Sequence, residues 1–284
     1  MKKNSYKHFN NFAKYYTKLY NEKNFLNFYP ANNIRFKIVS KLLSIYSPKK
    51  IVDAGCGAGL PLIDLKKKGF NIIGYDKSQE MVKEAKKNLK KNKLSENLIF
   101  LDDFEKTKKI KKKSVDCIIG LGAFYYSRNF IKTMKNQISQ LKNNGRIIFS
   151  LRNELFDLST FNNYSKNFFL KLYNINSKSK NYNKFTKLFK GYKNISQNFQ
   201  KNIDQKKVYS SRHNPLNISI YLKNKLNLDV NNIYFYHYHC LPPFFEKKNK
   251  INFRKNSFKI ENPNSWKGYF LASAFILDCK IKKK

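Results

Sequence analysis

Short apolar runs alternate with amphipathic stretches through the first half of the chain. The runs lie at residues 51–52, 72–73, 98–101, 115–120 and 146–151. Between them, apolar side chains recur every three or four residues, which is the spacing of one helix face. Strands that alternate with helices predict βαβ units and a parallel sheet with right-handed crossovers. The pattern therefore predicts an α/β fold.

Two amphipathic helices are predicted ahead of this core, and each carries an apolar stripe. The first stripe consists of Phe9, Phe12, Tyr16 and Leu19. The second consists of Ile34, Ile38, Leu42 and Ile45, and it ends before Pro48. Such helices either pack on the sheet or form a lid over a bound ligand, and the pattern alone favours neither.

The most informative stretch is KIVDAGCGAGLPLIDLKKKGFNIIGYD. Its first apolar run ends at Asp53, glycines follow at Gly55, Gly57 and Gly59, and its second run ends at Asp76. Glycine permits a sharp turn and lets a ligand approach main-chain N–H groups. A carboxylate at the tip of the following strand suits hydrogen bonds to a ribose diol.

This pattern, D-x-G-x-G-x-G, resembles that of the class I S-adenosylmethionine (SAM)-dependent methyltransferases. The dinucleotide fingerprint G-x-G-x-x-G would need a glycine where this chain has Leu60. An acid at the end of the first strand would repel a pyrophosphate but could hold a cationic amino-acid group. Because only 18 of 284 residues are acidic, two acids at the two required places make the resemblance specific.

The resemblance implies a Rossmann-like, seven-stranded, mostly parallel sheet with an antiparallel last strand and helices on both faces. Residues 48–151 would form the SAM-binding core, after an N-terminal helical segment or lid at residues 1–47. Residues 152–228 would be a helical insertion that caps the substrate. Residues 229–284 would supply the terminal strands that complete the sheet.

The resemblance also implies further cofactor residues at the strand tips. At the tip of the third strand the family places an acid and an apolar residue around adenine, and Asp103 and Phe104 match best. The tip of the fourth strand, at Leu121, should face the methyl group. Tyr125 and Tyr126 follow that tip and are candidate substrate-binding residues.

The fourth tip reads LGAFYY, which departs from the N/D-P-P-Y/F motif of methyltransferases that modify exocyclic amines of nucleic-acid bases. No Pro-Cys nucleophile is present either, which disfavours cytosine C5 chemistry. Both departures weaken a base-methylating interpretation.

Methyl transfer from a sulfonium requires alignment and the exclusion of water, and a hydroxyl acceptor adds the need for a general base. Candidate bases are His213, His239 and Glu154. Arg152 follows the fifth strand and could pair with a phosphate or carboxylate of the substrate. The alternatives are packed or exposed histidines and an ordinary Arg152–Glu154 ion pair. His237 and His239 have no nearby third ligand, so no metal site is expected.

A formal net charge of +40 invites a nucleic-acid interpretation. The 58 basic residues, however, are 52 lysines and 6 arginines spread along an asparagine-rich chain. Because guanidinium reads phosphates and bases better than ammonium does, a selected nucleic-acid surface would contain more arginine. We therefore interpret the charge as compositional bias and expect no specific nucleic-acid partner, only adventitious binding at low salt.

Four cysteines without C-x-x-C spacing favour a reducing compartment. The sequence contains neither an apolar run of membrane-spanning length nor an apolar signal core, so a cytoplasmic protein without a transmembrane segment is expected.

The expected function is methyl transfer from SAM to a small molecule, with the hydroxyl oxygen of a sugar, lipid or quinone-like compound preferred. The long insertion favours such an enclosed site. An RNA or protein methyltransferase that uses the basic surface is the first alternative, and a non-catalytic SAM-binding scaffold is the second.

Overall fold

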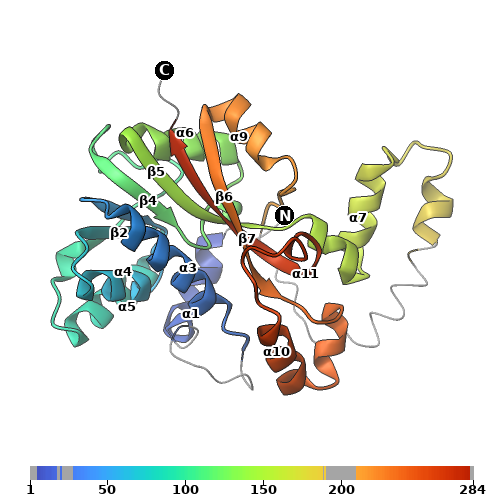
Figure 1. Cartoon of the computed structure of the whole chain (residues 1–284), viewed down its shortest axis with the longest axis horizontal. Helices are drawn as coiled ribbons and strands as arrows, with labels where there is room; N and C mark the ends of the chain where they lie inside the picture. Colours follow the sequence, from blue (N-terminus) through green and yellow to red (C-terminus); the bar gives the residue numbers. More distant parts are fainter. Residues whose placement is uncertain (1–4, 18–19, 21–27, 188, 190–208, 282–284) are drawn as a thin grey trace.

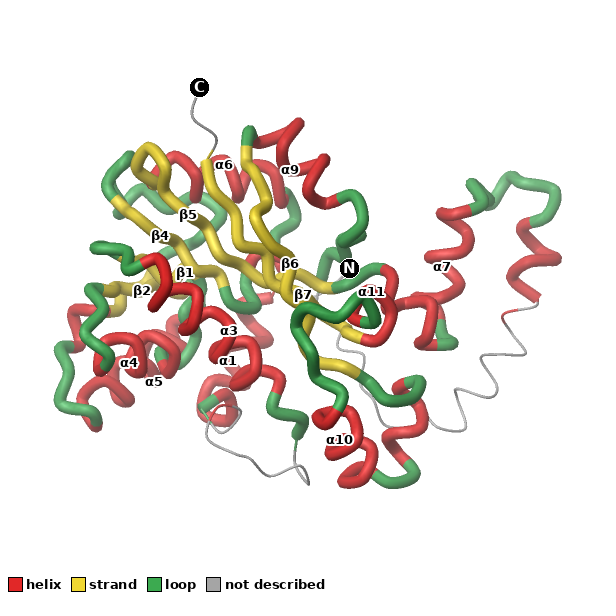
Figure 2. The backbone as a smooth tube through the Cα atoms, viewed as in Figure 1, coloured by secondary structure: helices red, strands yellow, loops and turns green. Residues whose placement is uncertain are grey.

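The computed structural model describes residues 5–17, 20, 28–187, 189 and 209–281. Among these, seven strands form one sheet in the order β3-β2-β1-β4-β5-β7-β6 (Figures 1 and 2). The strands are β1 (Ile51–Ala54), β2 (Ile72–Asp76), β3 (Ile99–Leu101), β4 (Val115–Gly120), β5 (Leu141–Arg152), β6 (Leu228–Tyr238) and β7 (Ala272–Ile281). Strands β1 to β5 are parallel, and β7 runs antiparallel between β5 and β6. The predicted fold class is confirmed.

Helices cover both faces of the sheet. The α-helices are α1 (Ser5–Tyr16), α3 (Ala31–Tyr46), α4 (Leu60–Lys67), α5 (Gln79–Lys91), α6 (Phe130–Gln140), α7 (Asn163–Leu172), α9 (Ile218–Leu226), α10 (Lys250–Lys259) and α11 (Gly268–Leu271). Short 3-10 helices are η1 (Glu96–Leu98), η2 (Phe124–Tyr126), η3 (Leu155–Thr160) and η4 (Pro243–Lys247). Helices α6 and α9 pack on one face, and α3, α4 and α5 pack on the other. Within the described residues, no helix combines the length and apolar character needed to cross a membrane.

Helix α3 buries Leu42 of the predicted stripe and packs Ile34 and Ile38 against the core, but the last member of the stripe does not follow. Phe36, Val39 and Leu43 lie in the core, whereas Ile45 is 64% exposed. The helix has apolar residues on more than one face, so its contact with the sheet, and not its periodicity, decided which face is buried. This orientation also carries Arg35 toward the strand tips.

Asn143, Asn144 and Gly145, residue types that favour turns, lie inside β5. Leu141 pairs with Val115 and Arg146 pairs with Cys117, so the residues between them form an irregularity in the strand. Asn144 takes a left-handed conformation, with φ of 65°. Residues on both sides of this irregularity pair with β4. Strand β5 therefore begins at Leu141, before its apolar run at residues 146–151.

The segment predicted as a substrate cap, residues 152–228, divides into different parts. Helix α7 projects away from the sheet (Figure 1). Helix α9 instead supplies Ile218 and Leu222 to the core under the sheet. The C-terminal part of this segment is therefore a structural element of the core. Residues 188 and 190–208 lie outside the described part.

Candidate active site

The turn after β1 depends on glycine. Gly55, Gly57 and Gly59 all have positive φ, at 80°, 54° and 77°. A Cβ on Gly55 would lie 2.5 Å from the Cβ of Ala123, which no real structure tolerates. A Cβ on Gly59 would lie 2.8 Å from the Cδ1 of Ile99. Gly59 therefore packs closely at the start of α4, whereas Gly55 and Gly57 line the pocket described below.

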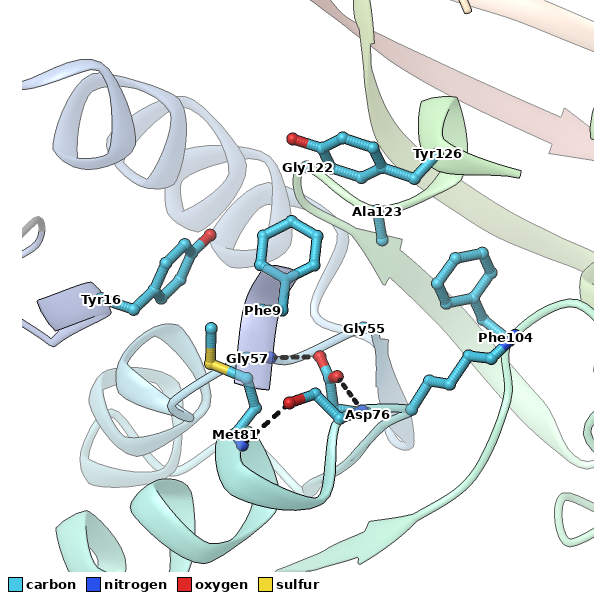
Figure 3. A pocket seen from close by; sticks show the side chains of 12 residues that line it. Phe9, Tyr16, Gly55, Gly57, Asp76, Met81, Phe104, Gly122, Ala123 and Tyr126 are labelled. Carbon is cyan, nitrogen blue, oxygen red and sulfur yellow. Dashed lines mark hydrogen bonds between the residues drawn. The ribbon is translucent and has the colours of Figure 1, made fainter. Parts of the chain in front are cut away.

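Asp76, at the tip of β2, closes this turn. Its Oδ2 accepts the N–H of Gly57 at 2.9 Å, and its Oδ1 accepts the N–H of Ser78 at 2.8 Å (Figure 3). Burial raises the pKa of the Asp76 carboxyl, and these amide bonds partly oppose the rise. Each oxygen retains capacity for a further donor, as a ribose hydroxyl would supply.

A pocket opens above these tips, with an empty volume of about 480 Å³ that includes its mouth. We call it the strand-tip pocket. Its lining residues are Phe9, Tyr16, Gly55, Gly57, Asp76, Lys77, Ser78, Met81, Phe104, Gly122, Ala123 and Tyr126. Helix α1 contributes Phe9 and Tyr16 as a cover, and the Phe9 ring lies edge-on to Tyr126 at 5.1 Å (Figure 3).

Two buried groups of opposite charge lie behind the pocket. Asp53 is 1% exposed and Arg35 is 4% exposed. Within the described part of the chain, neither the Oδ1 of Asp53 nor the Nε of Arg35 has a hydrogen-bond partner. Burial, with a smaller contribution from Asp76, raises the pKa of Asp53 to about 7, while Arg35 lowers it. The Nη1 of Arg35 lies 2.6 Å from where a Gly122 Cβ would be, so the guanidinium abuts the pocket lining.

This donor set fits SAM. An unpartnered carboxylate oxygen and an unpartnered guanidinium nitrogen complement the ammonium and carboxylate of an amino acid. Asp76 stands at the tip of β2, where a ribose diol would be bound, and Phe104 offers a ring on the side of β3. Sequence reasoning missed Arg35. The sequence did contain one signal for Arg35, because arginine is rare in this chain and occurs only 6 times.

A family model described as "Methyltransferase domain" matches residues 45–214, more than half of the chain. The chain belongs to this family. The predicted assignment to the class I SAM-dependent methyltransferases, the assignment as an enzyme and SAM as the cofactor are confirmed.

Curated relatives match less than half of this methyltransferase. An uncharacterized protein of Haemophilus influenzae is 31% identical over 144 residues, which cover 46% of this chain and 57% of that protein. A ubiquinone biosynthesis O-methyltransferase of Rickettsia canadensis is 30% identical over 128 residues, which cover 44% and 53%. The chain therefore spans about half the length of the curated relatives it matches.

Solved structures match nearly the whole methyltransferase chain. A SAM-dependent methyltransferase of Thermotoga maritima, described as a possible histamine N-methyltransferase, has a TM-score of 0.53 at 15% identity and covers 96% of this chain and 98% of its own. Magnesium protoporphyrin IX methyltransferase of Synechocystis, with bound SAH, has a TM-score of 0.50 at 14% identity, with 89% and 84% covered. These likenesses show the fold.

Five of the predicted site residues line the strand-tip pocket: Gly55, Gly57, Asp76, Phe104 and Tyr126. Asp103 instead pairs with Lys77, whose Nζ lies 2.8 Å from its Oδ2. Leu121 is buried in the core, and the next two residues, Gly122 and Ala123, take its predicted place at the pocket. Strand β4 itself ends at Gly120, as the sequence predicts.

Arg152 and Tyr125 lie just beyond the pocket. Arg152 pairs with Ala274 across β5 and β7, and Ala274 pairs with Tyr236 across β7 and β6, so these residues share one face of the sheet. The Arg152 guanidinium lies 5.0 Å from the centre of the Tyr125 ring, and the Tyr126 ring lies beside that of Tyr125, with 4.5 Å between their centres. These two tyrosines therefore separate Arg152 from the strand-tip pocket.

The three candidate bases are outside the pocket lining given above. The Nε2 of His213 lies 3.0 Å from the Oγ of Ser211. Burial, and less strongly Lys171, lowers the pKa of His213 to about 4. Burial also lowers the pKa of His239 to about 4. Glu154 pairs with Lys171 at 2.5 Å, in place of the ion pair with Arg152 that was the alternative to a catalytic role. This geometry gives the predicted bases no support.

Proposed function

We propose that this methyltransferase transfers the methyl group of SAM to an oxygen atom of a small molecule. The observation that carries the proposal is the aromatic cover of the strand-tip pocket. Phe9 and Tyr16 of α1, with Tyr126 of η2, surround the side where an acceptor would enter. Such a cover admits a small planar molecule more readily than a nucleic acid or folded protein.

Residues of this chain would hold SAM as follows. Asp53 would face the ammonium group and Arg35 the carboxylate of its methionine portion. Asp76 would accept hydrogen bonds from the ribose, and Phe104 would pack against the adenine, with Asp103 as the predicted partner of its amino group. SAM, when bound, supplies an electrophilic methyl group on a sulfonium.

The protein itself aligns the acceptor with the methyl group and excludes water from the site. Gly122 and Ala123 leave space at the tip of β4, where the acceptor would approach. Phe9, Tyr16 and Tyr126 would exclude water and so limit hydrolysis while fixing the acceptor in line. The Rickettsia relatives carry the name ubiquinone biosynthesis O-methyltransferase, which supports an oxygen acceptor of small size.

The first test combines SAM binding with transfer of labelled methyl groups. The chain is incubated with methyl-labelled SAM and separate pools of phenols and carboxylic acids, structured RNA, and peptides. We expect label in the small-molecule pool. Labelling of RNA or peptides would overturn the proposal, and SAM binding without any transfer would favour a scaffold.

Two glycine variants test whether SAM binds in the strand-tip pocket. Gly57→Val places a side chain in the turn, where a Cβ would lie 3.1 Å from the Tyr16 ring, and should weaken SAM binding by at least about tenfold. Gly69→Val is the control, because Gly69 has φ of 88° but no atom within 4 Å of its Cβ. The control carries similar backbone strain and should keep SAM affinity. Equal losses in both variants would remove Gly57 from the site.

A further inference from the structure

Arg152 is a cation held by aromatic side chains. Its guanidinium lies over the ring of Tyr125, which in turn contacts the ring of Tyr126, and both tyrosines come from η2 after β4. The side chain comes from the end of β5, a rigid element, and the residue keeps part of its surface accessible. A guanidinium has five N–H donors, so these contacts leave donors for a ligand.

The neighbouring carboxylates are committed elsewhere. Asp157 pairs with Arg212 at 3.0 Å, and Glu154 pairs with Lys171. Among the described residues, no carboxylate forms an ion pair with Arg152. The charge of Arg152 affects the pKa of a neighbouring histidine. Burial chiefly lowers the pKa of His237, and His239 and then Arg152 lower it further. A cation largely enclosed by protein without a counterion is costly unless an anion joins it.

We propose that Arg152 binds a carboxylate group of the methyl acceptor, which makes the substrate an acidic small molecule. The inference rests on the proposed function, because it places this anchor beside the site of methyl transfer. Tyr126 lines the strand-tip pocket, and its ring contacts that of Tyr125, over which the Arg152 guanidinium lies. A molecule held at Arg152 therefore needs to extend past only these two side chains to reach the tip of β4.

Two features favour a carboxylate over a phosphate ester. One uncompensated guanidinium balances the single charge of a carboxylate but only part of a phosphate dianion's charge. The flat guanidinium is also fixed by the Tyr125 ring below it, which presents a fork suited to two coplanar oxygens. The aromatic surroundings of Tyr125, Tyr126 and Tyr236 suit a planar apolar body attached to that carboxylate.

The test compares benzoate with benzamide, which has nearly the same shape but no charge, and with phenyl phosphate. Thermal unfolding is followed with saturating S-adenosylhomocysteine and each probe at about 20 mM. We expect benzoate to raise Tm by about 2 °C or more, and benzamide and phenyl phosphate to have little effect. Arg152→Gln should abolish the benzoate shift and leave the affinity for S-adenosylhomocysteine unchanged.

Arg128→Gln is the matched control, since Arg128 is exposed between η2 and α6 and its loss removes the same charge outside the site. It should keep the full benzoate shift. If Arg152→Gln does not fold, Arg152→Lys keeps the charge but loses the fork, and it should weaken benzoate binding about tenfold.

The outcomes separate this inference from the proposed function. Equal shifts with benzoate and benzamide, no benzoate shift, or a shift that survives in Arg152→Gln would overturn the carboxylate anchor. A larger shift with phenyl phosphate would overturn the choice of carboxylate. The proposed function instead fails if the chain binds no SAM or labels only macromolecules, whatever the benzoate result.

Discussion

At the scale of single residues, a few buried charges distinguish the site from a surface covered with lysines. Five of the 6 arginines make specific contacts within the protein: Arg35 with Tyr20, Arg146 with Asp278, Arg152 with Tyr125, Arg212 with Asp157, and Arg254 with Glu246. Lysine cannot reproduce planar, forked or stacked contacts. In a chain biased toward lysine, a retained arginine is therefore a sign of a position with defined geometry.

Asp53 is expected to make SAM binding sensitive to pH. Its pKa of about 7 means that the carboxyl is half protonated near neutrality, with Asp76 raising and Arg35 lowering that pKa. An ammonium group binds the ionised form, so SAM affinity should increase as pH rises from about 6 to about 8. Titration calorimetry at several pH values measures this change. Asp53→Asn should bind more weakly with a flatter profile, and an equally steep profile in this variant would assign the dependence to another group.

In the absence of SAM, Asp53 should make the folded protein less stable as pH rises. Its folded pKa lies above its ordinary value of 3.8, so the folded state binds the extra proton. The contribution of Asp53 to stability is therefore fully present at low pH and is lost as pH rises from about 4 to about 7. SAM binding should reverse part of that loss.

At the scale of elements, α1 and α3 resolve the two readings left open by their periodicity. Helix α3 packs on the sheet. Helix α1 packs against α5, where Ala13 meets Met81 and the Oγ of Ser78 lies 2.5 Å from Asn10 Oδ1. From there α1 reaches over the strand-tip pocket. Phe9 and Tyr16 of the predicted stripe thus line the strand-tip pocket, and Leu19 of that stripe lies outside the described residues.

Phe9→Ala should open this cover. The ring lines the pocket and contacts Tyr126, so its loss should raise the SAM dissociation rate by about tenfold while Tm changes little. Stopped-flow displacement of SAM measures the rate. Tyr15→Ala on the same helix is the control, since Tyr15 is 41% exposed and is outside the pocket lining. Similar acceleration in both variants would indicate general loosening of α1.

At the scale of the whole molecule, one buried carboxylate connects the antiparallel strand β7 to the parallel strand β5 and to helix α3. Asp278 of β7 is fully buried and accepts hydrogen bonds from Arg146 of β5 at 3.1 Å and from Tyr46 at the end of α3 at 2.5 Å. The Arg146 guanidinium also stacks on the Tyr46 ring, 3.6 Å from its centre. The C-terminal strand is thereby held to the parallel core.

Asp278→Ala should lower the free energy of unfolding by about 3 kcal/mol, because it leaves Arg146 partly buried without its partner. Urea unfolding followed by circular dichroism measures the change. Asp229→Ala is the control: its pair with Lys223 spans 3.8 Å between exposed side chains and should cost less than about 0.5 kcal/mol. A small loss for Asp278→Ala would mean that neighbouring packing alone holds β7 in place.

The sequence by itself determined the alternation of strands and helices, the glycine turn and the acids at Asp53 and Asp76. These features are local. A glycine turn needs positive φ at fixed positions, and parallel strands always end at the same edge of the sheet. For the same reason the family and its cofactor followed from one short stretch, and they were confirmed by the family match.

Only the tertiary structure decided which side chains meet from distant parts of the chain. It brought Arg35 of α3 to the tip of β4, placed Arg152 against Tyr125, and set the predicted bases His213 and His239 apart from the pocket lining. It also turned α3 so that Ile45 faces solvent. These outcomes depend on how the helices and strands pack against one another. The periodicity of a sequence predicts that a helix has an apolar face, but it does not predict what that face contacts.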